Sequence, residues 1–426
     1  MELTTTLLQS AILPAGIVAV LFALWLANDV LGRDRGTKAM QEVAGTIFEG
    51  AVAFMRRQYS TIALLAVFGS VAIGALISVF ETQAVAETDI YGVDLGIRTG
   101  ISFLFGAACS MASGIIGMYI SVKANLRTTA AARGGVVKAV QVAMRGGAVS
   151  GFLVVALSLL GVYGVFVAFG GLTNPSDAPF LIVGYGFGAS FVALFAQLGG
   201  GIYTKAADVG SDLVGKVEKG IPEDDPRNAG VIADLVGDNV GDCAGRGADL
   251  FESTAAENIG AMILGVLLFK SFGIAGILFP LVIGALGLVC SIIGVMSVST
   301  TEDADPMSAL NKGYYLTAFL VSIAIYFACK YLLIAPDAPD AWWHYFICAM
   351  IGVATSVAFV FITQYYTEYR YRPVLSIAEA SQTGPATNII MGLSVGMEST
   401  VLPVFTIAIA LVSSFMVGRA SGIMID

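Results

Sequence analysis

The stretch AGILFPLVIGALGLVCSIIGVMSVS, residues 275–299, contains no charged side chain and is long enough to cross a lipid bilayer as a helix. A membrane-spanning helix needs about 20 mostly apolar residues. Similar stretches recur along the chain and predict an all-α, polytopic transmembrane helix bundle with about ten spans. The predicted spans lie near residues 8–28, 60–80, 98–121, 148–170, 180–203, 230–270, 275–299, 313–334, 342–366 and 394–417.

The composition excludes two broad classes of protein. Hydrophobic residues make up 57% of the 426 residues and charged residues 12%, whereas soluble domains average about 45–50% and about 25%. A soluble globular enzyme is therefore excluded. Nucleic acid is not an expected partner, because the net charge is −9 and no basic block occurs. A zinc site or a Ser-His-Asp triad is not expected either, because His344 is the single histidine.

The positions of the basic residues predict the orientation in the membrane. With the N-terminus outside, 17 of the 22 lysines and arginines fall in connections that face the cytoplasm, as the positive-inside rule requires. No basic stretch precedes the first apolar run, so a retained first span is expected rather than a cleaved signal peptide. We expect one membrane domain, residues 1–426, with its special helices at 180–220 and 228–270.

Residues 201–260 concentrate the negative charge, with 12 of the 31 acidic residues. At 100° per residue, Asp234, Asp238 and Asp242 share one face of a helix, and Asp249 and Glu252 fall within or at the edge of the same arc. On the preceding helix a second shared face carries Lys205, Asp208, Asp212 and Lys216. The two stripes are joined by a short hairpin, VEKGIPEDDPRNAG, residues 217–230.

These charges are interpreted as a binding site rather than as solvated surface. Acidic residues within a membrane span cost roughly 2.5–3.5 kcal/mol each, and the same 60 residues hold only five cations. Bound metal ions can supply the missing positive charge. Oxygen ligands without His or Cys select Mg²⁺ or Ca²⁺, and carboxylates beside lysines suit a metal–phosphate substrate.

Two segments, GGGIYTKAADVGSDLVGKVEKGIPEDDPRNAG (199–230) and ADLVGDNVGDCAGRGADLFES (233–253), closely resemble the membrane-integral pyrophosphatases. The resemblance extends to SVKANLRTTAAA (121–132) and YRPVLSIAEASQTGPATNIIMGLSVG (371–396). It implies hydrolysis of pyrophosphate with Mg²⁺, K⁺ as a candidate activator, and transport of H⁺ or Na⁺. It also implies a homodimer in a prokaryotic plasma membrane, with a cytoplasmic active site.

Carried over by position, the resemblance assigns a role to each charged residue of the two stripes. Asp238 and Asp242 are implied to be catalytic, Asp242 by deprotonating the attacking water, with Asp234 in support. Lys205 and Lys216 resemble the phosphate contacts, and Asp249, Glu252 and Gln197 occupy the ion-gate positions. The implied Mg²⁺–pyrophosphate ligands are Asp208, Asp212, Glu223, Asp238 and Asp242.

Two departures from the family pattern affect the expectations. Gln197 stands where the family has an arginine that partners the gate aspartate, which puts normal ion coupling in doubt unless Arg246 or another cation substitutes. The family also carries a second carboxylate and lysine cluster in a longer C-terminal part. We therefore expect a truncated pump with half of the active site, inactive as the 426-residue chain alone.

Two readings remain as alternatives to a pump. One is a secondary cation transporter whose carboxylates bind ions without hydrolysis. The EDDPR hairpin and the lysines argue against it, because a simple cation site does not need phosphate-binding groups. The other is a non-catalytic fragment that folds only beside its missing half. Cys243, next to Asp242, is interpreted as a packing residue rather than a redox-sensitive thiol.

Overall fold

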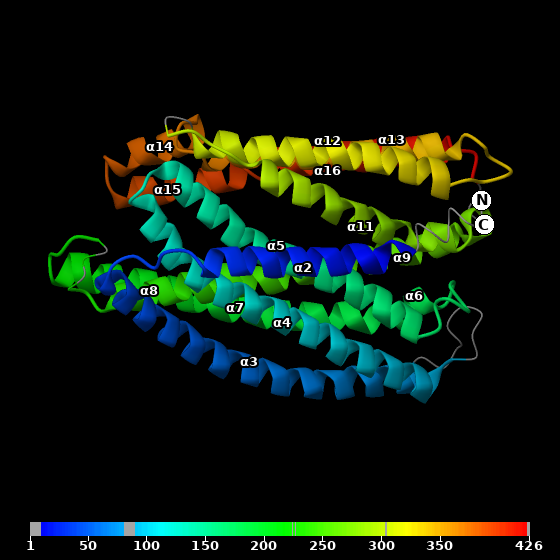
Figure 1. Cartoon of the computed structure of the whole chain (residues 1–426), viewed down its shortest axis with the longest axis horizontal. Helices are drawn as coiled ribbons and strands as arrows, with labels where there is room; N and C mark the ends of the chain where they lie inside the picture. Colours follow the sequence, from blue (N-terminus) through cyan, green and yellow to red (C-terminus); the bar gives the residue numbers. More distant parts are fainter. Residues whose placement is uncertain (1–9, 81–89, 224, 226, 303–304, 424–426) are drawn as a thin grey trace. The chain divides into compact units, whose positions relative to one another are not determined.

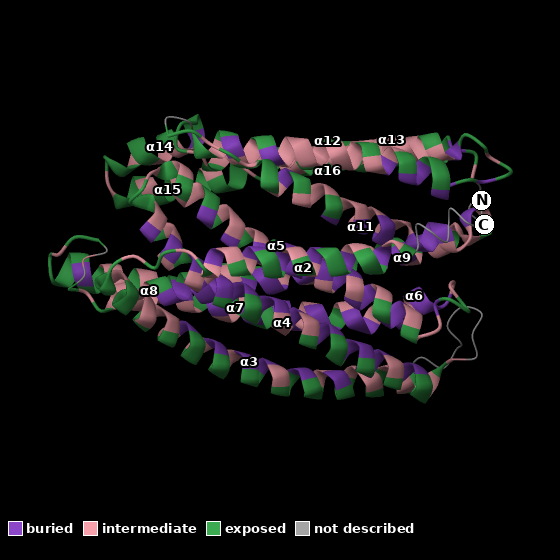
Figure 2. Ribbon diagram, in the orientation of Figure 1, coloured by how far each residue is buried: buried purple, intermediate pink, exposed green. Residues whose placement is uncertain are grey.

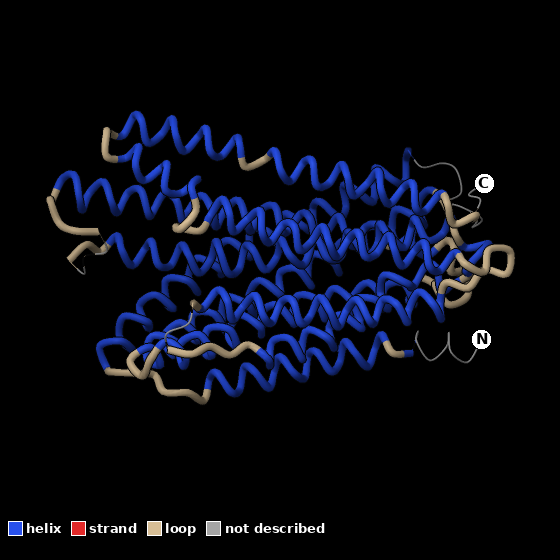
Figure 3. Tube along the Cα trace, turned by 90° about the horizontal axis from the view of Figure 1, so that it is seen from above, coloured by secondary structure: helices blue, strands red, loops and turns tan. Residues whose placement is uncertain are grey.

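The computed structural model describes residues 10–80, 90–223, 225, 227–302 and 305–423. Within these ranges the chain forms helices and loops, without a β-strand (Figure 3). It divides into two compact units, Met1–Thr317 and Ala318–Asp426. Ten helices of the described residues are long and apolar enough to cross a membrane, which confirms the predicted polytopic all-α fold.

The first unit contains most of the helices (Figure 1). Their bounds are α2 (Ile12–Leu31), α3 (Lys38–Phe80), α4 (Gly92–Ala132), α5 (Val136–Ala168), α6 (Ala178–Leu181), α7 (Val183–Asp212), η1 (Leu213–Glu218), α8 (Gly230–Asp238), η2 (Asn239–Gly245), α9 (Arg246–Leu267), α10 (Phe269–Phe272) and α11 (Ile274–Ser297). The helix α12 (Pro306–Leu332) begins in this unit and ends in the second.

The core of the first unit lies around α4, which contacts α3, α5, α7, η2 and α9. Glycines allow this close packing, because α4 and α7 approach one another at main-chain distance. A Cβ added at Gly188 would lie 1.8 Å from the Phe103 carbonyl oxygen, and one at Gly106 would lie 2.0 Å from the Tyr185 carbonyl oxygen. Small residues at helix contacts are the usual packing device in membrane proteins. Figure 2 shows the resulting buried band along α4 and α7 and the exposed outer side of α3.

The second unit is built from the rest of α12 with α13 (Ala341–Thr367), α14 (Arg372–Ser381), α15 (Pro385–Glu398) and α16 (Val401–Arg419). Its aromatic residues gather where α12 and α13 meet, with the Tyr326 and Trp342 ring centroids 5.7 Å apart. Such rings are typical of the membrane–water interface. The imidazole of His344 lies 3.1 Å from the Asp340 main-chain oxygen, one helical turn earlier.

The predicted spans agree with the helices in number and place, apart from residues 8 and 9, which lie outside the described residues, but several helices are longer. Lys38–Phe80 and Gly92–Ala132 contain 43 and 41 residues, whereas about 20 suffice to cross a bilayer. Hydropathy finds only the apolar part of each helix, because the polar continuation beyond the bilayer carries no hydrophobic signal. The helices α3 and α4 are therefore longer than the spans predicted for them at 60–80 and 98–121.

Candidate functional site

The two charged stripes lie on helices that pack closely against each other within the first unit. Gly237 faces the main chain of Thr204, where an added Cβ would lie 2.7 Å from the Thr204 Cα, and a Cβ at Gly200 would lie 2.8 Å from the Val240 carbonyl oxygen. Gly241 and Gly245 extend the contact. A Cβ added at Gly245 would lie 3.0 Å from the Gln197 Cα. The four-residue spacing of the glycines at 237, 241 and 245 is the sequence signal for this contact.

Both charged helices contain a π-helical segment at the candidate site. The α7 helix continues as η1, and α8 continues as η2 before α9 begins. Asp242 lies in η2, so the regular α-helical spacing from which the stripe of Asp234, Asp238 and Asp242 was predicted ends at Asp238. A π-helical turn contains more residues than an α-helical turn and re-aims the side chains that follow. Such segments are frequent at functional sites.

Two lysines pair with acidic residues along the α7–η1 face. Lys205 Nζ lies 3.0 Å from Asp208 Oδ2, and Lys216 Nζ lies 3.0 Å from Asp212 Oδ2. Lys216 also reaches Glu223 Oε2 of the hairpin at 2.7 Å. The side chains are partly to largely exposed, with 75% of Lys205 and 40% of Lys216 accessible. The structure therefore holds a solvent-accessible row of paired charges rather than a closed site.

Asn228 fastens the hairpin between the two helices. Its Nδ2 donates to the Ser211 carbonyl oxygen at 2.8 Å and to Ser211 Oγ at 3.1 Å. Its Oδ1 accepts from the Gly230 amide at 2.9 Å, at the start of α8. Sequence analysis assigned no role to Asn228. An Asn just before a helix is the available signal, because its side chain commonly accepts a hydrogen bond from the first turn.

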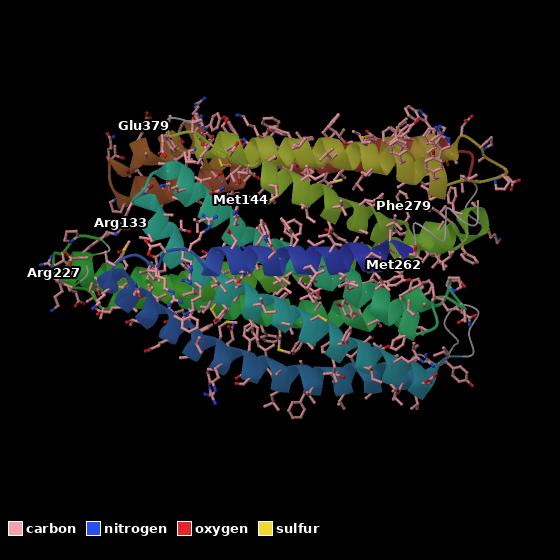
Figure 4. The ribbon with its side chains drawn as sticks, viewed as in Figure 1. Arg133, Met144, Arg227, Met262, Phe279 and Glu379 are labelled. Atoms are coloured by element: carbon pink, nitrogen blue, oxygen red, sulfur yellow. The ribbon has the colours of Figure 1, made fainter. Side chains whose placement is uncertain are left out.

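An ion pair closes the outer part of this hairpin. Asp225 accepts hydrogen bonds from Arg227 Nε at 2.8 Å, from Nη2 at 2.7 Å and from the Arg227 amide at 2.9 Å. The hydrogen bonds and charge of Arg227 lower the pKa of the Asp225 carboxyl to about 2. Figure 4 shows Arg227 at the hairpin end of the first unit, far along α8 and α9 from Met262. Asp224, in the same hairpin, lies outside the described residues.

The acidic residues of α8 and η2 differ in exposure, with Asp234 half-buried and Asp238 and Asp242 exposed. Asn239, between them, is buried and fixed by two hydrogen bonds: Asn125 Nδ2 donates to its Oδ1 at 3.1 Å, and its Nδ2 donates to the Leu235 carbonyl oxygen at 2.8 Å. Sequence reasoning missed this pair, which joins α4 to η2. It holds the backbone on which Asp238 and Asp242 are carried.

The predicted metal ligands are chemically suitable but are not gathered into a cluster. Carboxylates alone are the donor set that Mg²⁺ and Ca²⁺ prefer. Among the described residues, no three acidic, histidine or cysteine side chains approach closely enough to hold a metal ion. Instead Lys216 Nζ lies between Asp212 and Glu223. The donor chemistry fits a hard cation, and the predicted set of Asp208, Asp212, Glu223, Asp238 and Asp242 stays a prediction.

Two side-chain contacts connect α7 with α9 deeper in the bundle. Gln197 Nε2 lies 3.4 Å from Asp249 Oδ2, and Ser190 Oγ donates to Glu252 Oε1. The structure thus places Gln197 beside Asp249 and, as a separate pair, Ser190 beside Glu252. Arg246 is exposed and forms no ion pair with any residue that the structure describes, so it does not replace the missing arginine beside Asp249.

Cys243 is half-buried on η2, where its Sγ lies 3.0 Å from Ser121 Oγ of α4. A Cβ added at Gly117 would lie 3.9 Å from the Cys243 carbonyl oxygen. These contacts place Cys243 in the α4–η2 packing, which agrees with its interpretation as a packing residue. The five cysteines of the chain are all free thiols.

Comparison with known families decides the identity of the chain. The family model for inorganic H⁺ pyrophosphatase matches residues 17–425. The chain belongs to this pyrophosphatase family. Among its relatives is the K⁺-insensitive pyrophosphate-energized proton pump 2 of Moorella thermoacetica, 56% identical over 97% of this chain and 58% of the relative.

More distant relatives in the pyrophosphatase family differ in the ion that their names give. The pyrophosphate-energized membrane proton pump 3 of Arabidopsis thaliana is 46% identical over 96% of this chain and 53% of its own length. The putative K⁺-stimulated pyrophosphate-energized sodium pump of Clostridium tetani is 41% identical over 96% of this chain and 56% of its own length. The chain thus spans little more than half the length of these relatives.

Proposed function

We propose that the protein forms part of a pump that hydrolyses inorganic pyrophosphate with Mg²⁺ and uses the free energy to move H⁺ across a membrane, with half of the active site on these 426 residues. Lys216 carries this proposal, because it joins Asp212 of α7 to Glu223 of the hairpin at 3.0 and 2.7 Å. A flexible ammonium group among carboxylates is suited to exchange these partners for phosphate oxygens. Membership of the pyrophosphatase family supports this assignment.

The proposed substrate site spans the facing stripes of α7–η1 and α8–η2. Lys205 and Lys216 would contact the phosphate oxygens. The residues that would hold Mg²⁺ are Asp208, Asp212, Glu223, Asp238 and Asp242. When bound, Mg²⁺ would neutralise the charge that develops on the phosphoryl oxygens.

The proposed chemistry is attack by water on a phosphorus atom of pyrophosphate, with loss of the second phosphate as the leaving group. Asp242 would orient the water and accept its proton, while Asp238 and the supporting Asp234 keep the neighbouring field negative. The π-helical backbone at Asp242, fixed through Asn239 and Asn125, would hold this carboxylate in position. Positioning of this kind supplies much of the catalysis of phosphoryl transfer.

The proposed ion gate is formed by Asp249, Glu252 and Gln197. Asp242 and Asp249 lie on one continuous run of helix, η2 followed by α9, so a shift of this helix at the substrate would reach the gate. Gln197 donates to Asp249 without neutralising it. We propose that this neutral partner takes the place of the family's arginine at the gate.

The remaining proposals concern the ion, the activator and the membrane. We propose transport of H⁺ without activation by K⁺, because identity is higher with the K⁺-insensitive proton pump of Moorella than with the K⁺-stimulated sodium pump of Clostridium. A homodimer, an external N-terminus, a prokaryotic plasma membrane and a cytoplasmic active site complete the proposal. One membrane domain, with its substrate and gate helices at 180–220 and 228–270, also remains a proposal.

The test is pyrophosphate hydrolysis by membranes that contain these residues within a pump of the relatives' full length, with Asp242→Asn compared with Glu257→Gln. Both variants remove one negative charge, and Glu257 is exposed on α9 outside the proposed site. Asp242→Asn should lower the Mg²⁺-dependent rate by about 10²-fold or more, the contribution of a positioned base. Glu257→Gln should keep the wild-type rate. Equal rates in the two variants would exclude Asp242 from catalysis.

A further inference from the structure

A basic cavity of about 350 Å³ lies between α2, α3 and α4 of the first unit, apart from the proposed substrate site. Arg35, Lys123 and Arg127 line it, together with the neutral side chains of Gln41 and Tyr119. No carboxylate of the described residues lines this cavity. The nearby Asp29 is already bound by Arg33 at 3.0 Å and by Arg145 at 2.8 Å.

Arg127 places a nearly buried positive charge in the wall, because only 3% of the residue is exposed. Its Nε and Nη2 donate to the Leu31 carbonyl oxygen at 3.2 and 2.8 Å, and its Nη1 donates to the Lys123 carbonyl oxygen at 2.7 Å. Three of the five guanidinium N–H groups thus donate to main-chain oxygens. These oxygens carry no formal charge, so the guanidinium has no counter-ion among these partners. The other two have no partner among the described residues.

Lys123 adds a second charge, one helical turn before Arg127. Its Nζ lies 3.7 Å from the centre of the Phe48 ring and 5.9 Å from that of Tyr119. Contact with ring faces holds an ammonium group but does not neutralise it. No ion pair of Lys123 with a described residue competes for it. Arg35, exposed in the loop between α2 and α3, brings a third charge to the cavity.

We propose that this cavity binds the phosphate group of an anionic ligand. Gathering three cations without a counter-ion is unfavourable, especially where one is buried, and a bound anion removes that cost. Guanidinium groups suit the paired oxygens of a phosphate, and lysine adds a point charge. The source is either the headgroup of an anionic phospholipid, for which basic pockets between membrane helices are suited, or free phosphate.

The experiment measures binding to the purified full chain with two probes, phosphatidylglycerol in phosphatidylcholine nanodiscs and inorganic phosphate. The variant R35Q/K123Q removes two cavity charges. The control K38Q/R57Q removes two charges from exposed residues of α3 that do not line the cavity. Each basic residue near an anionic membrane surface contributes about fivefold to binding, so R35Q/K123Q should weaken binding by about 30-fold. The control should bind as the wild type does.

The two probes identify the ligand source. Charge-dependent binding of phosphatidylglycerol alone assigns the cavity to a lipid headgroup, and binding of inorganic phosphate alone assigns it to a soluble anion. Lys123→Arg, which keeps the charge, should retain binding even if R35Q/K123Q does not fold. The proposal is overturned if the wild type binds neither probe, or if Lys123→Gln binds both as tightly as Lys123→Arg. Neither readout depends on pyrophosphate hydrolysis.

Discussion

Gln197 Nε2 lies 3.4 Å from Asp249 Oδ2, across the contact between α7 and α9. Two turns earlier on α7, Ser190 donates to Glu252, one turn later on α9. The two contacts run in opposite directions along the antiparallel helices and connect both proposed gate carboxylates to α7. A movement of α7 would therefore reach Asp249 and Glu252 together.

Replacing Gln197 by Leu should separate transport from hydrolysis. The substitution removes the hydrogen bond to Asp249 and leaves a half-buried carboxylate without that donor, which should lower the free energy of unfolding by about 1 kcal/mol. Hydrolysis at the distant substrate site should persist while proton uptake per pyrophosphate changes. Leu198→Ala, at an exposed neighbour, serves as the control. Unchanged proton uptake and unchanged stability in Gln197→Leu would contradict the proposed gate.

Gly237→Ala should disrupt the contact that brings the charged helices together. The new Cβ would lie 2.7 Å from the Thr204 Cα, whereas a Cβ at Gly201 on α7 would meet no atom within 4 Å. Overpacking of this kind costs about 1–3 kcal/mol. Thermal unfolding should occur at a lower temperature in Gly237→Ala and not in Gly201→Ala. A wild-type unfolding temperature in both would mean that the two helices do not approach at Gly237.

Lys216→Gln should affect substrate binding more than Lys219→Gln. Lys216 contacts Asp212 and Glu223, and Lys219 is an exposed lysine three residues further along the chain. Losing one charge-assisted contact to phosphate should raise the KM for Mg²⁺–pyrophosphate by about tenfold or more. Steady-state kinetics of the two variants measure this difference. If Lys219→Gln has the larger effect, Lys216 is not the phosphate contact.

The Asp225–Arg227 pair predicts a pH effect confined to strong acid. Because Arg227 lowers the pKa of Asp225 to about 2 from an ordinary value of 3.8, folded Asp225 binds its proton less readily than unfolded Asp225. Its stabilising effect is therefore complete above pH about 4 and is lost as the pH falls through about 2. Carboxyl NMR titration of Asp225 should give a midpoint near 2 in the wild type. In Arg227→Gln the midpoint should rise, and an unchanged midpoint would show that the ion pair does not form.

Hydropathy located every helix that is long enough to span a membrane, because apolar length is written directly in the sequence. The π-helical segments at Leu213–Glu218 and Asn239–Gly245 could not be predicted in this way. They arise from a local shift of main-chain hydrogen bonds, which leaves the composition unchanged. The approach of Gly237 and Gly241 to Thr204 was visible only as spacing, since the partner helix is chosen by tertiary packing.

The candidate site was predicted unevenly. Residue types and spacing indicated the two charged stripes. The ion pairs Lys205–Asp208 and Lys216–Asp212 also follow from the sequence, because their members stand three and four positions apart on a helix. The contacts of Asn228 with Ser211 and of Asn239 with Asn125 depend on how separate helices pack. The distances among the five predicted metal ligands likewise depend on tertiary structure and on the charge that occupies the site.

The most direct test of the central claim is protection of the α7–α8 hairpin from trypsin. Lys219 and Arg227 are exposed cleavage points. Pyrophosphate with Mg²⁺ should slow cleavage at both, while Mg²⁺ alone or pyrophosphate alone should not, and Lys216→Gln should weaken the protection. Equal protection by Mg²⁺ alone would indicate a simple cation site. Cleavage at the same rate with and without Mg²⁺–pyrophosphate would contradict the proposed substrate site.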